Sequence, residues 1–239
     1  MGSWRIGAEE HVAKDYFLDI ADDGYVMTTQ AACDDTQRET LRNCICSGEW
    51  RPTMFTSKLD ECTDNGCACS RMRNPAARKL FLRLVADRIL AVSQGKDKVK
   101  YASLGCGLLR FDFELLELLL AAGLPVSEVH LVDSMYDKDA AKAKAHAAAL
   151  AQFAAWFSGP LDIFAHPSIE KFAFHARKNE VLPVAVLQVD CWELTEVFDA
   201  QVKPMLEEVL HYGGLFCALT ARGSTTKSGG LACSDAWGE

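Results

Sequence analysis

Beyond residue 98 the chain alternates short runs of consecutive apolar residues with longer segments in which apolar residues recur at helical spacing. This alternation is typical of parallel strands joined by helical crossovers. It predicts an α/β fold with three layers and a mostly parallel sheet of about five strands. The first predicted strand begins near residue 99, and the others cover residues 129–132, 161–165, 184–189 and 215–220.

Helices are predicted from capping residues and from apolar periodicity. Asn74 and Pro75 favour a helix start, because asparagine caps free backbone N–H groups and proline tolerates the first helical position. The helix after them covers residues 76–92, and its predicted apolar face consists of Leu80, Phe81, Leu84, Val85, Ile89 and Val92. The other predicted helices cover residues 9–20, 108–122, 137–157 and 204–210.

The pattern divides the chain into three parts. Residues 1–73 lack sustained periodicity and are rich in Asp, Thr, Cys and Gly, so we predict an irregular, Cys-rich N-terminal extension or lid. Residues 74–222 hold the alternating strands and helices and form the predicted ligand-binding domain. Residues 223–239 are rich in Gly and polar residues, which predicts a mobile tail.

The net charge of -8 argues against a protein whose whole surface binds nucleic acid, since phosphate binding requires Lys and Arg. Residues 71–100 differ from the rest, with nine basic residues against two acidic ones. We interpret this segment as a solvated helix face, with an anion or RNA contact as the alternative. No apolar run approaches the ~20 residues of a membrane span, and the N-terminus lacks the apolar core of a signal sequence. We therefore expect a cytoplasmic protein without a membrane segment.

Ten cysteines is a high number for a cytoplasmic chain of this length. Cys106, Cys191 and Cys217 fall in or beside predicted strands, where a thiol packs as a small apolar side chain. Six others cluster between Cys33 and Cys69, where two Cys-x-Cys pairs and a nearby cysteine supply enough thiolates for one zinc ion. The predicted zinc ligands are Cys44, Cys46, Cys62, Cys67 and Cys69. Free thiols and disulfides are the alternatives for this cluster.

A glycine turn comes after the first predicted strand, and an acidic residue comes after the second. Gly105 and Gly107 lie in the turn, and Asp133 ends the next strand, 26 residues beyond Gly107. Glycine lets the backbone approach a ligand closely, and a carboxylate in this position accepts hydrogen bonds from ribose hydroxyls. The unit predicts a site for a nucleotide-like ligand. The alternative is structural, because glycine turns also pack helix on strand and an Asp after a strand often caps the next helical turn.

The carboxyl ends of parallel strands share one edge of a sheet, where ligands bind. This placement predicts a set of cofactor-binding residues: Ser103, Gly105, Cys106, Gly107, Asp133, Asp190 and Cys191. Trp192 and Thr220 lie at the same edge. If the reaction requires a general base, the candidates are Asp190, His166 and His211.

These motifs resemble those of class I S-adenosylmethionine-dependent methyltransferases, which have a Rossmann-like fold. The matching segments are Leu104–Gly107, Leu131–Asp133 and Gln188–Asp190, and the resemblance covers residues 99–220. It implies S-adenosylmethionine as the cofactor and methyl transfer to an acceptor that the sequence does not identify. It also implies that Gly105 and Gly107 border the methionine portion, that Asp133 binds the ribose, and that Asp190 lies near the adenine or the transferred methyl.

Two departures from the family pattern favour a second hypothesis. Leu109 replaces a further glycine of the turn, and we expect its side chain to crowd a bound cofactor. A polar tail comes after the last strand instead of the family's antiparallel strand pair. The alternative function is therefore a non-catalytic, nucleotide-binding or partner-binding subunit, with a partner or the N-terminal extension covering the sheet edge after the fifth strand. A nicotinamide enzyme is a third hypothesis, but Arg110 replaces the last glycine of Gly-x-Gly-x-x-Gly.

Overall fold

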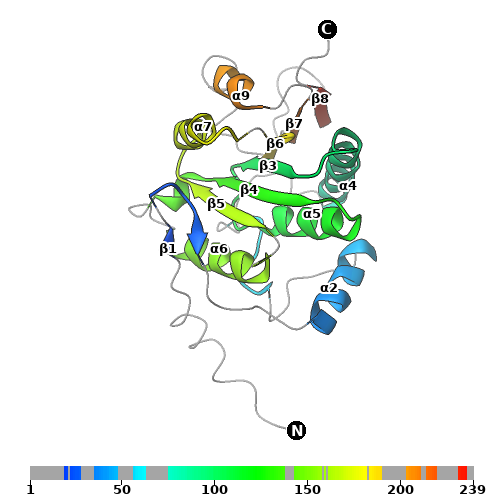
Figure 1. Ribbon diagram of the computed structural model, residues 1–239. Helices are drawn as coiled ribbons and strands as arrows, with labels where there is room; N and C mark the ends of the chain where they lie inside the picture. The colour runs from blue at the N-terminus through cyan, green and yellow to red at the C-terminus, as the bar shows by residue number, and fades with distance from the viewer. Residues whose placement is uncertain are drawn as a thin grey trace, which may run out of the picture.

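The computed structural model describes twelve parts of the chain (Figure 1): residues 19–20, 22–27, 35–47, 56–62, 75–137, 143–157, 159, 161–181, 183–189, 203–210, 214–219 and 231–235.

A six-stranded sheet forms the centre of the molecule, with strand order β5-β4-β3-β6-β7-β8. The first five strands in this order are parallel, so the predicted α/β fold with a mostly parallel, Rossmann-like sheet is confirmed. The strands are β3 (Val99–Leu104), β4 (Val126–Val132), β5 (Asp162–His166), β6 (Ala185–Val189), β7 (Leu215–Leu219) and β8 (Leu231–Asp235). Chain order runs outward from β3 to β5 on one side and resumes at β6 on its other side. The sheet therefore changes direction beside β3, where open α/β sheets bind ligands.

Strand β8 corrects the prediction of a strandless tail over residues 223–239. Leu231–Asp235 pairs antiparallel with β7, from Leu215 opposite Asp235 to Leu219 opposite Leu231. The segment is short and polar at its end, so its composition carries little strand signal, and its pairing comes from backbone hydrogen bonds to a preformed neighbour. The edge after the fifth strand is thus covered by the chain's own C-terminal segment.

A small hairpin from the N-terminal extension covers the opposite edge of the sheet. Strands β1 (Asp19–Ile20) and β2 (Val26–Met27) pair antiparallel. The adjacent Tyr25 forms a bridge with Phe164 of β5. Residues 19–20 were predicted to end a helix, and that prediction is wrong for them. An open edge strand can pair with other chains. The hairpin covers the β5 edge, for which the sequence predicted no covering segment.

Helices cover both faces of the sheet, which completes the three predicted layers (Figure 1). One face packs side chains such as Tyr101 and Leu131 against α2, α4, α5 and α6, and the other packs Leu104 and Val132 against α7 and α9. The helices are α2 (Asp35–Ser47), α4 (Pro75–Val92), α5 (Arg110–Ala121), α6 (Ala143–Phe157), α7 (Ile169–Lys178) and α9 (Lys203–Val209). Helices α2 and α7 were not predicted from the sequence.

The apolar face predicted for α4 is wrong at its N-terminal end. Leu80 is 63% exposed, whereas Arg78 is buried with Phe81 and Val85. Arg78 is buried because it donates to two acidic groups, Glu61 through Nε and Glu114 through Nη1, the latter at 2.8 Å. The basic side chains Lys79, Arg83 and Arg88 are exposed, as expected for a solvated helix face.

A buried carboxylate on α5 provides a polar connection between α2 and the rest of the domain. Glu117 is 1% exposed, and its Oε1 accepts a hydrogen bond of 2.7 Å from the indole N–H of Trp156 on α6. Its Oε2 accepts one of 2.8 Å from Arg42 of α2. Arg38 of α2 adds a hydrogen bond to the Trp156 carbonyl and lies 5.3 Å from the centre of its ring. Part of the extension that was predicted to be irregular is therefore an ordered helix.

Replacing Glu117 with Ala is expected to lower the free energy of unfolding by about 2–4 kcal/mol, because it leaves a buried indole N–H and an arginine without their acceptor. Arg42→Ala, which removes only the half-exposed partner, is expected to cost about 1 kcal/mol. Chemical denaturation of the two variants and the wild type measures both effects. Equal losses for both variants would show that Glu117 does not organise this contact.

Candidate functional site

The glycine turn between β3 and α5 has the backbone conformation that the sequence predicted. Gly105 has φ 66° and Gly107 has φ 60°, both in the left-handed region that glycine adopts without strain. The Gly105 N–H donates to the carbonyl of Val132 at 2.8 Å, which ties the turn to the end of β4. Both glycines are partly exposed, so their backbone is accessible at the carboxyl edge of the sheet.

Leu109 does not crowd this edge, contrary to the sequence expectation. Its φ of 65° turns the chain a third time, and its side chain is completely buried in the hydrophobic core. The backbone of Asp60 forms a hydrogen bond on each side of this strained residue. Its N–H donates to the Leu108 carbonyl at 3.1 Å, and its carbonyl accepts the Arg110 N–H at 3.2 Å. The left-handed conformation costs a leucine about 1–2 kcal/mol, which its burial offsets.

Asp133 connects the glycine turn after β3 with the loop after β4. Its Oδ2 accepts a hydrogen bond from the Gly107 N–H at 2.9 Å. Its Oδ1 accepts one from the Met135 N–H at 2.9 Å, which caps the short 3-10 helix η2 (Ser134–Tyr136). Only 12% of the side chain is exposed, and Nε2 of His146 on α6 lies 3.9 Å from Oδ1. The capping role that the sequence left as an alternative is present, and each carboxylate oxygen keeps a lone pair for a further donor.

Cys106 and Ser103, two of the predicted cofactor contacts, are completely buried beneath the turn. The Cys106 thiol lies 3.3 Å from the Tyr136 hydroxyl, and burial raises the pKa of Tyr136 well above its ordinary value. Ser103 is on the same strand as Tyr101, facing the core. The side chains of Cys106 and Ser103 are thus buried beneath the turn. Their contact with a ligand stays a prediction.

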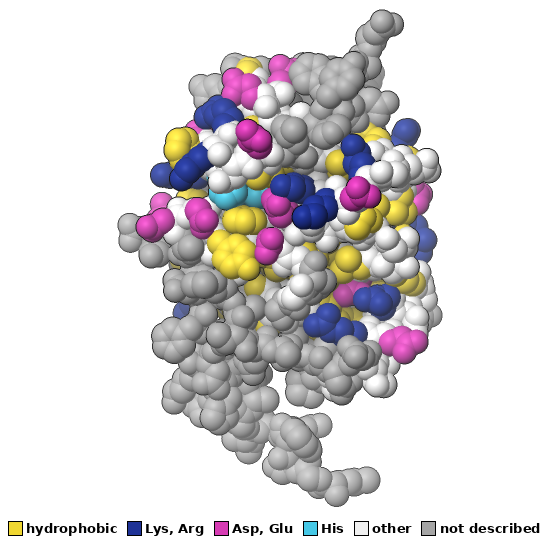
Figure 2. Space-filling view, viewed as in Figure 1, with side chains coloured by type: hydrophobic (Ala, Val, Ile, Leu, Met, Phe, Trp, Pro, Cys, Tyr) yellow, Lys and Arg dark blue, Asp and Glu magenta, His cyan; other side chains and the backbone are white. Residues whose placement is uncertain are grey.

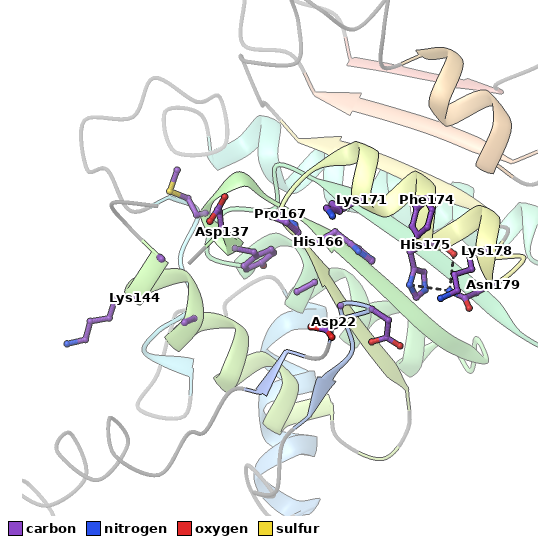
Figure 3. Close-up of a pocket in the computed structure, with 17 residues that line it drawn as sticks. Asp22, Asp137, Lys144, His166, Pro167, Lys171, Phe174, His175, Lys178 and Asn179 are labelled. Atoms are coloured by element: carbon purple, nitrogen blue, oxygen red, sulfur yellow. Dashed lines mark hydrogen bonds between the residues drawn. The ribbon is translucent and has the colours of Figure 1, made fainter. Parts of the chain in front are cut away.

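A cavity of about 860 Å³ opens beside the loop after Asp133 and is lined there by Met135, Tyr136 and Asp137, whereas Asp133 and the glycine turn do not line it (Figure 3). Its walls come from the β1–β2 turn, η2, the start of α6, the end of β5 and α7. The charges of its lining differ between walls, since Lys171 and Lys178 come from α7 and Asp22 and Asp23 from the hairpin turn. Figure 2 shows basic, acidic and histidine side chains side by side on one face of the molecule.

His166 lines this cavity but is poorly suited to the role of general base. It is 3% exposed, and its Nε2 lies 3.2 Å from Nδ1 of His130. Burial and the neighbouring histidines lower the pKa of His166 to about 3. A general base functions best with a pKa near the working pH, so the structure disfavours this candidate.

Several predicted site residues lie outside the described residues. These are the predicted site residues Asp190, Cys191, Trp192, His211 and Thr220, and the cysteines Cys33, Cys67 and Cys69. Their assigned roles stay predictions.

The predicted zinc site receives no support from the part of the chain that the structure describes, where no group of three or more potential ligands is suitably placed. Cys44 and Cys46 lie on α2, two residues apart, and side chains with that spacing point to different sides of a helix. The Cys-x-Cys spacing would suit a metal only in an extended segment. Cys44 and Cys46 are free thiols.

No family model matches the chain, and no curated protein matches it. The chain is similar to the solved structure of the SAM-dependent methyltransferase from Agrobacterium tumefaciens, with 18% sequence identity and a TM-score of 0.36, over 60% of this chain and 46% of that one. It is also similar to an O-methyltransferase family protein from Burkholderia thailandensis, with 20% identity and a TM-score of 0.30, over 63% and 44%. The match spans less than half the length of each neighbour. The sheet topology gives this chain a Rossmann-like fold.

No helix in the described ranges is long and apolar enough to cross a membrane.

Replacing Asp133 with Ala is expected to destabilise the protein by about 1–3 kcal/mol, because two backbone N–H groups lose their acceptor. Asp133→Asn retains one acceptor oxygen and is expected to lose roughly half as much. Thermal denaturation measures both, with Asp137→Ala, an exposed acid of the same loop, as the control. An Asp133→Ala variant as stable as this control would contradict the connecting role of the carboxylate.

Proposed function

We propose that the chain binds S-adenosylmethionine across the carboxyl ends of β3 and β4 and transfers its methyl group to an acceptor. The observation that carries this proposal is the link between the glycine turn and Asp133 through the Gly107 N–H at 2.9 Å. This hydrogen bond lies where the strand order changes direction. It places the exposed backbone of the glycine turn next to Asp133, the carboxylate that we propose binds the ribose.

The residues present fit the chemistry of this cofactor. The partly exposed backbone of Gly105 and Gly107 leaves room for close approach at the end of β3. The remaining lone pairs of Asp133 are suited to two adjacent ribose hydroxyls. The cavity beside Met135 provides space for the nucleoside base next to that ribose. Each of these features supports a nucleoside ligand with the ribose at Asp133.

Methyl transfer requires the protein mainly to orient and desolvate its ligands. When bound, S-adenosylmethionine supplies a methyl group on a positively charged sulfur. The chain's part is to fix the ribose through Asp133 and so to aim the reacting end along the turn toward the ends of β3 and β6. Since positioning provides most of the rate, the absence of a suitable base at His166 is compatible with this reaction.

A second candidate function is a non-catalytic nucleotide-binding subunit. The observation that favours it is that Asp133 already accepts two backbone N–H groups, so a ribose competes with a capping role. Ligand titration separates the two functions, because only the first requires discrimination in favour of the sulfonium cofactor and its product.

Isothermal titration with S-adenosylmethionine, its demethylated product and NAD is expected to show micromolar binding of the first two and none of NAD. Gly107→Ala is expected to weaken binding at least tenfold, about 1.4 kcal/mol, because a side chain at a φ of 60° strains the turn whose N–H Asp133 holds.

The matched control is Gly123→Ala, which has a similar φ of 78° and no atom within 4 Å of the added Cβ, far from the turn. It is expected to lose stability but not affinity. Binding of none of the three ligands, or equal losses in both variants, would contradict the proposal.

A further inference from the structure

The β1–β2 hairpin is held against the sheet edge at very close range. The Ala165 N–H of β5 donates to the Gly24 carbonyl at 2.8 Å, and the rings of Tyr25 and Phe164 meet edge to face at 5.4 Å. Gly24 has φ 92°, and a Cβ on it would lie 2.8 Å from the Ala165 carbonyl oxygen and 3.0 Å from Cε1 of His166. The hairpin therefore contacts His166 directly and leaves no room for a side chain at Gly24.

Three histidines from three different elements lie beneath this hairpin. We name His130 of β4, His166 of β5 and His175 of α7 the histidine cluster; Figure 3 shows His166 and His175 on the cavity wall. All three are at least 94% buried, and their ring centres are 5.2 to 5.5 Å apart. Phe164 and Phe172 stack against the same rings. An apolar enclosure of this kind accepts neutral imidazoles and penalises charged ones.

The charged groups around the cluster do not offset the cost of protonating one of its histidines. Glu128 lies 3.3 Å from Nε2 of His130, but Lys100 holds the same carboxylate at 2.6 Å. Burial is the main cause that lowers the pKa of each histidine.

His175 is influenced by two acidic groups and one basic group: Asp23, Glu128, which also raises its pKa, and Lys178. Asp23 of the hairpin turn hydrogen-bonds to its ring and raises its pKa, whereas Lys178 of α7 lowers it, and burial outweighs both. His166 faces only the other two histidines, and its pKa falls to about 3.

We infer that the histidine cluster is a proton-operated switch for the β1–β2 hairpin. At neutral pH the neutral cluster packs against the hairpin, which closes one wall of the cavity. Proton uptake by His166 and His175, the two members that contact the hairpin, releases it from β5 and α7 and opens that wall. His130 stays within the sheet. This inference stands independently of the ligand that the cavity holds.

The direction and size of the effect result from linkage. A histidine released into water has a pKa of about 6.5, above its value in the closed state, so the closed state is fully favoured above pH 6.5 and loses its advantage as the pH falls below it. For His166 alone, a closed-state pKa of about 3 predicts about thirtyfold more opening at pH 5.0 than at pH 7.5.

Amide hydrogen exchange of the whole chain tests this switch directly. The reporter is the Ala165 N–H, whose acceptor is the hairpin carbonyl of Gly24, and the reference is the Gly105 N–H, whose acceptor is Val132 in the central sheet. After correction for the intrinsic pH dependence of exchange, the Ala165 N–H is expected to exchange at least thirtyfold faster at pH 5.0 than at pH 7.5. The Gly105 N–H is expected to change less than threefold. Equal acceleration at both amides, or none at Ala165, would overturn the inference.

Two variants separate proton uptake from mechanical release. Gly24→Ala is expected to expose the Ala165 N–H at pH 7.5, because the added Cβ displaces the hairpin. Gly159→Ala, with a similar φ of 98° and nothing within 4 Å of its Cβ, is the control that carries only the backbone strain.

His166→Asn with His175→Gln is expected to reduce the acid response at Ala165 below threefold. A thirtyfold response that persists in this double variant would overturn the inference. If the double variant does not fold, the wild-type comparison of Ala165 with Gly105 still decides.

Discussion

The carboxylate of Asp133 is the contact on which the proposed site depends. It stands one residue beyond β4, and it holds the N–H of Gly107 from the turn after β3 and that of Met135 from its own loop. Through these two hydrogen bonds, the side chain directly connects the loops at the ends of β3 and β4. The same carboxylate therefore sets the local shape of the edge, and in the proposed site it is the acceptor for the ribose hydroxyls.

The surroundings of this contact are built to keep the glycine turn in place. The buried Arg78 lies between Glu61 and Glu114, which connects the segment 56–62 to α4 and α5. Asp60 from the same segment hydrogen-bonds on both sides of Leu109, so the left-handed leucine is supported by backbone as well as by burial. On the other side, the hairpin and α7 form the cavity wall over the histidine cluster. The site is thus supported by segments from both ends of the domain.

The sequence predicts features that depend on local pattern, and it fails where contacts over long distances decide. The alternation of apolar runs such as 184–189 with helical segments was sufficient to predict the parallel sheet. The Gly-x-Gly turn predicts ligand binding at its carboxyl edge. Helix α7 was missed although both of its local signals are present. Ser168 caps it, with its side chain accepting the Lys171 N–H, and its buried residues include Ile169, Phe172, Ala173 and Ala176 at helical spacing. Strand β8 was missed because its pairing with β7 is invisible in its own five residues.

The same distinction applies to the site residues. Leu109 was expected to crowd a ligand because a leucine replaces a glycine, but a left-handed backbone and a neighbouring segment direct its side chain into the core. The role of Asp133 as a cap was visible as an alternative, while its bond to Gly107 required the fold. The histidine cluster joins residues from two strands and a helix, and no spacing in the sequence relates them.

A crystal structure of the protein with the demethylated product of S-adenosylmethionine tests the central claim most directly. The account predicts that both ribose hydroxyls lie within about 3 Å of the Asp133 carboxylate, with the Gly107 N–H still bonded to it. A ligand bound elsewhere, or a ribose that does not contact Asp133, would contradict it.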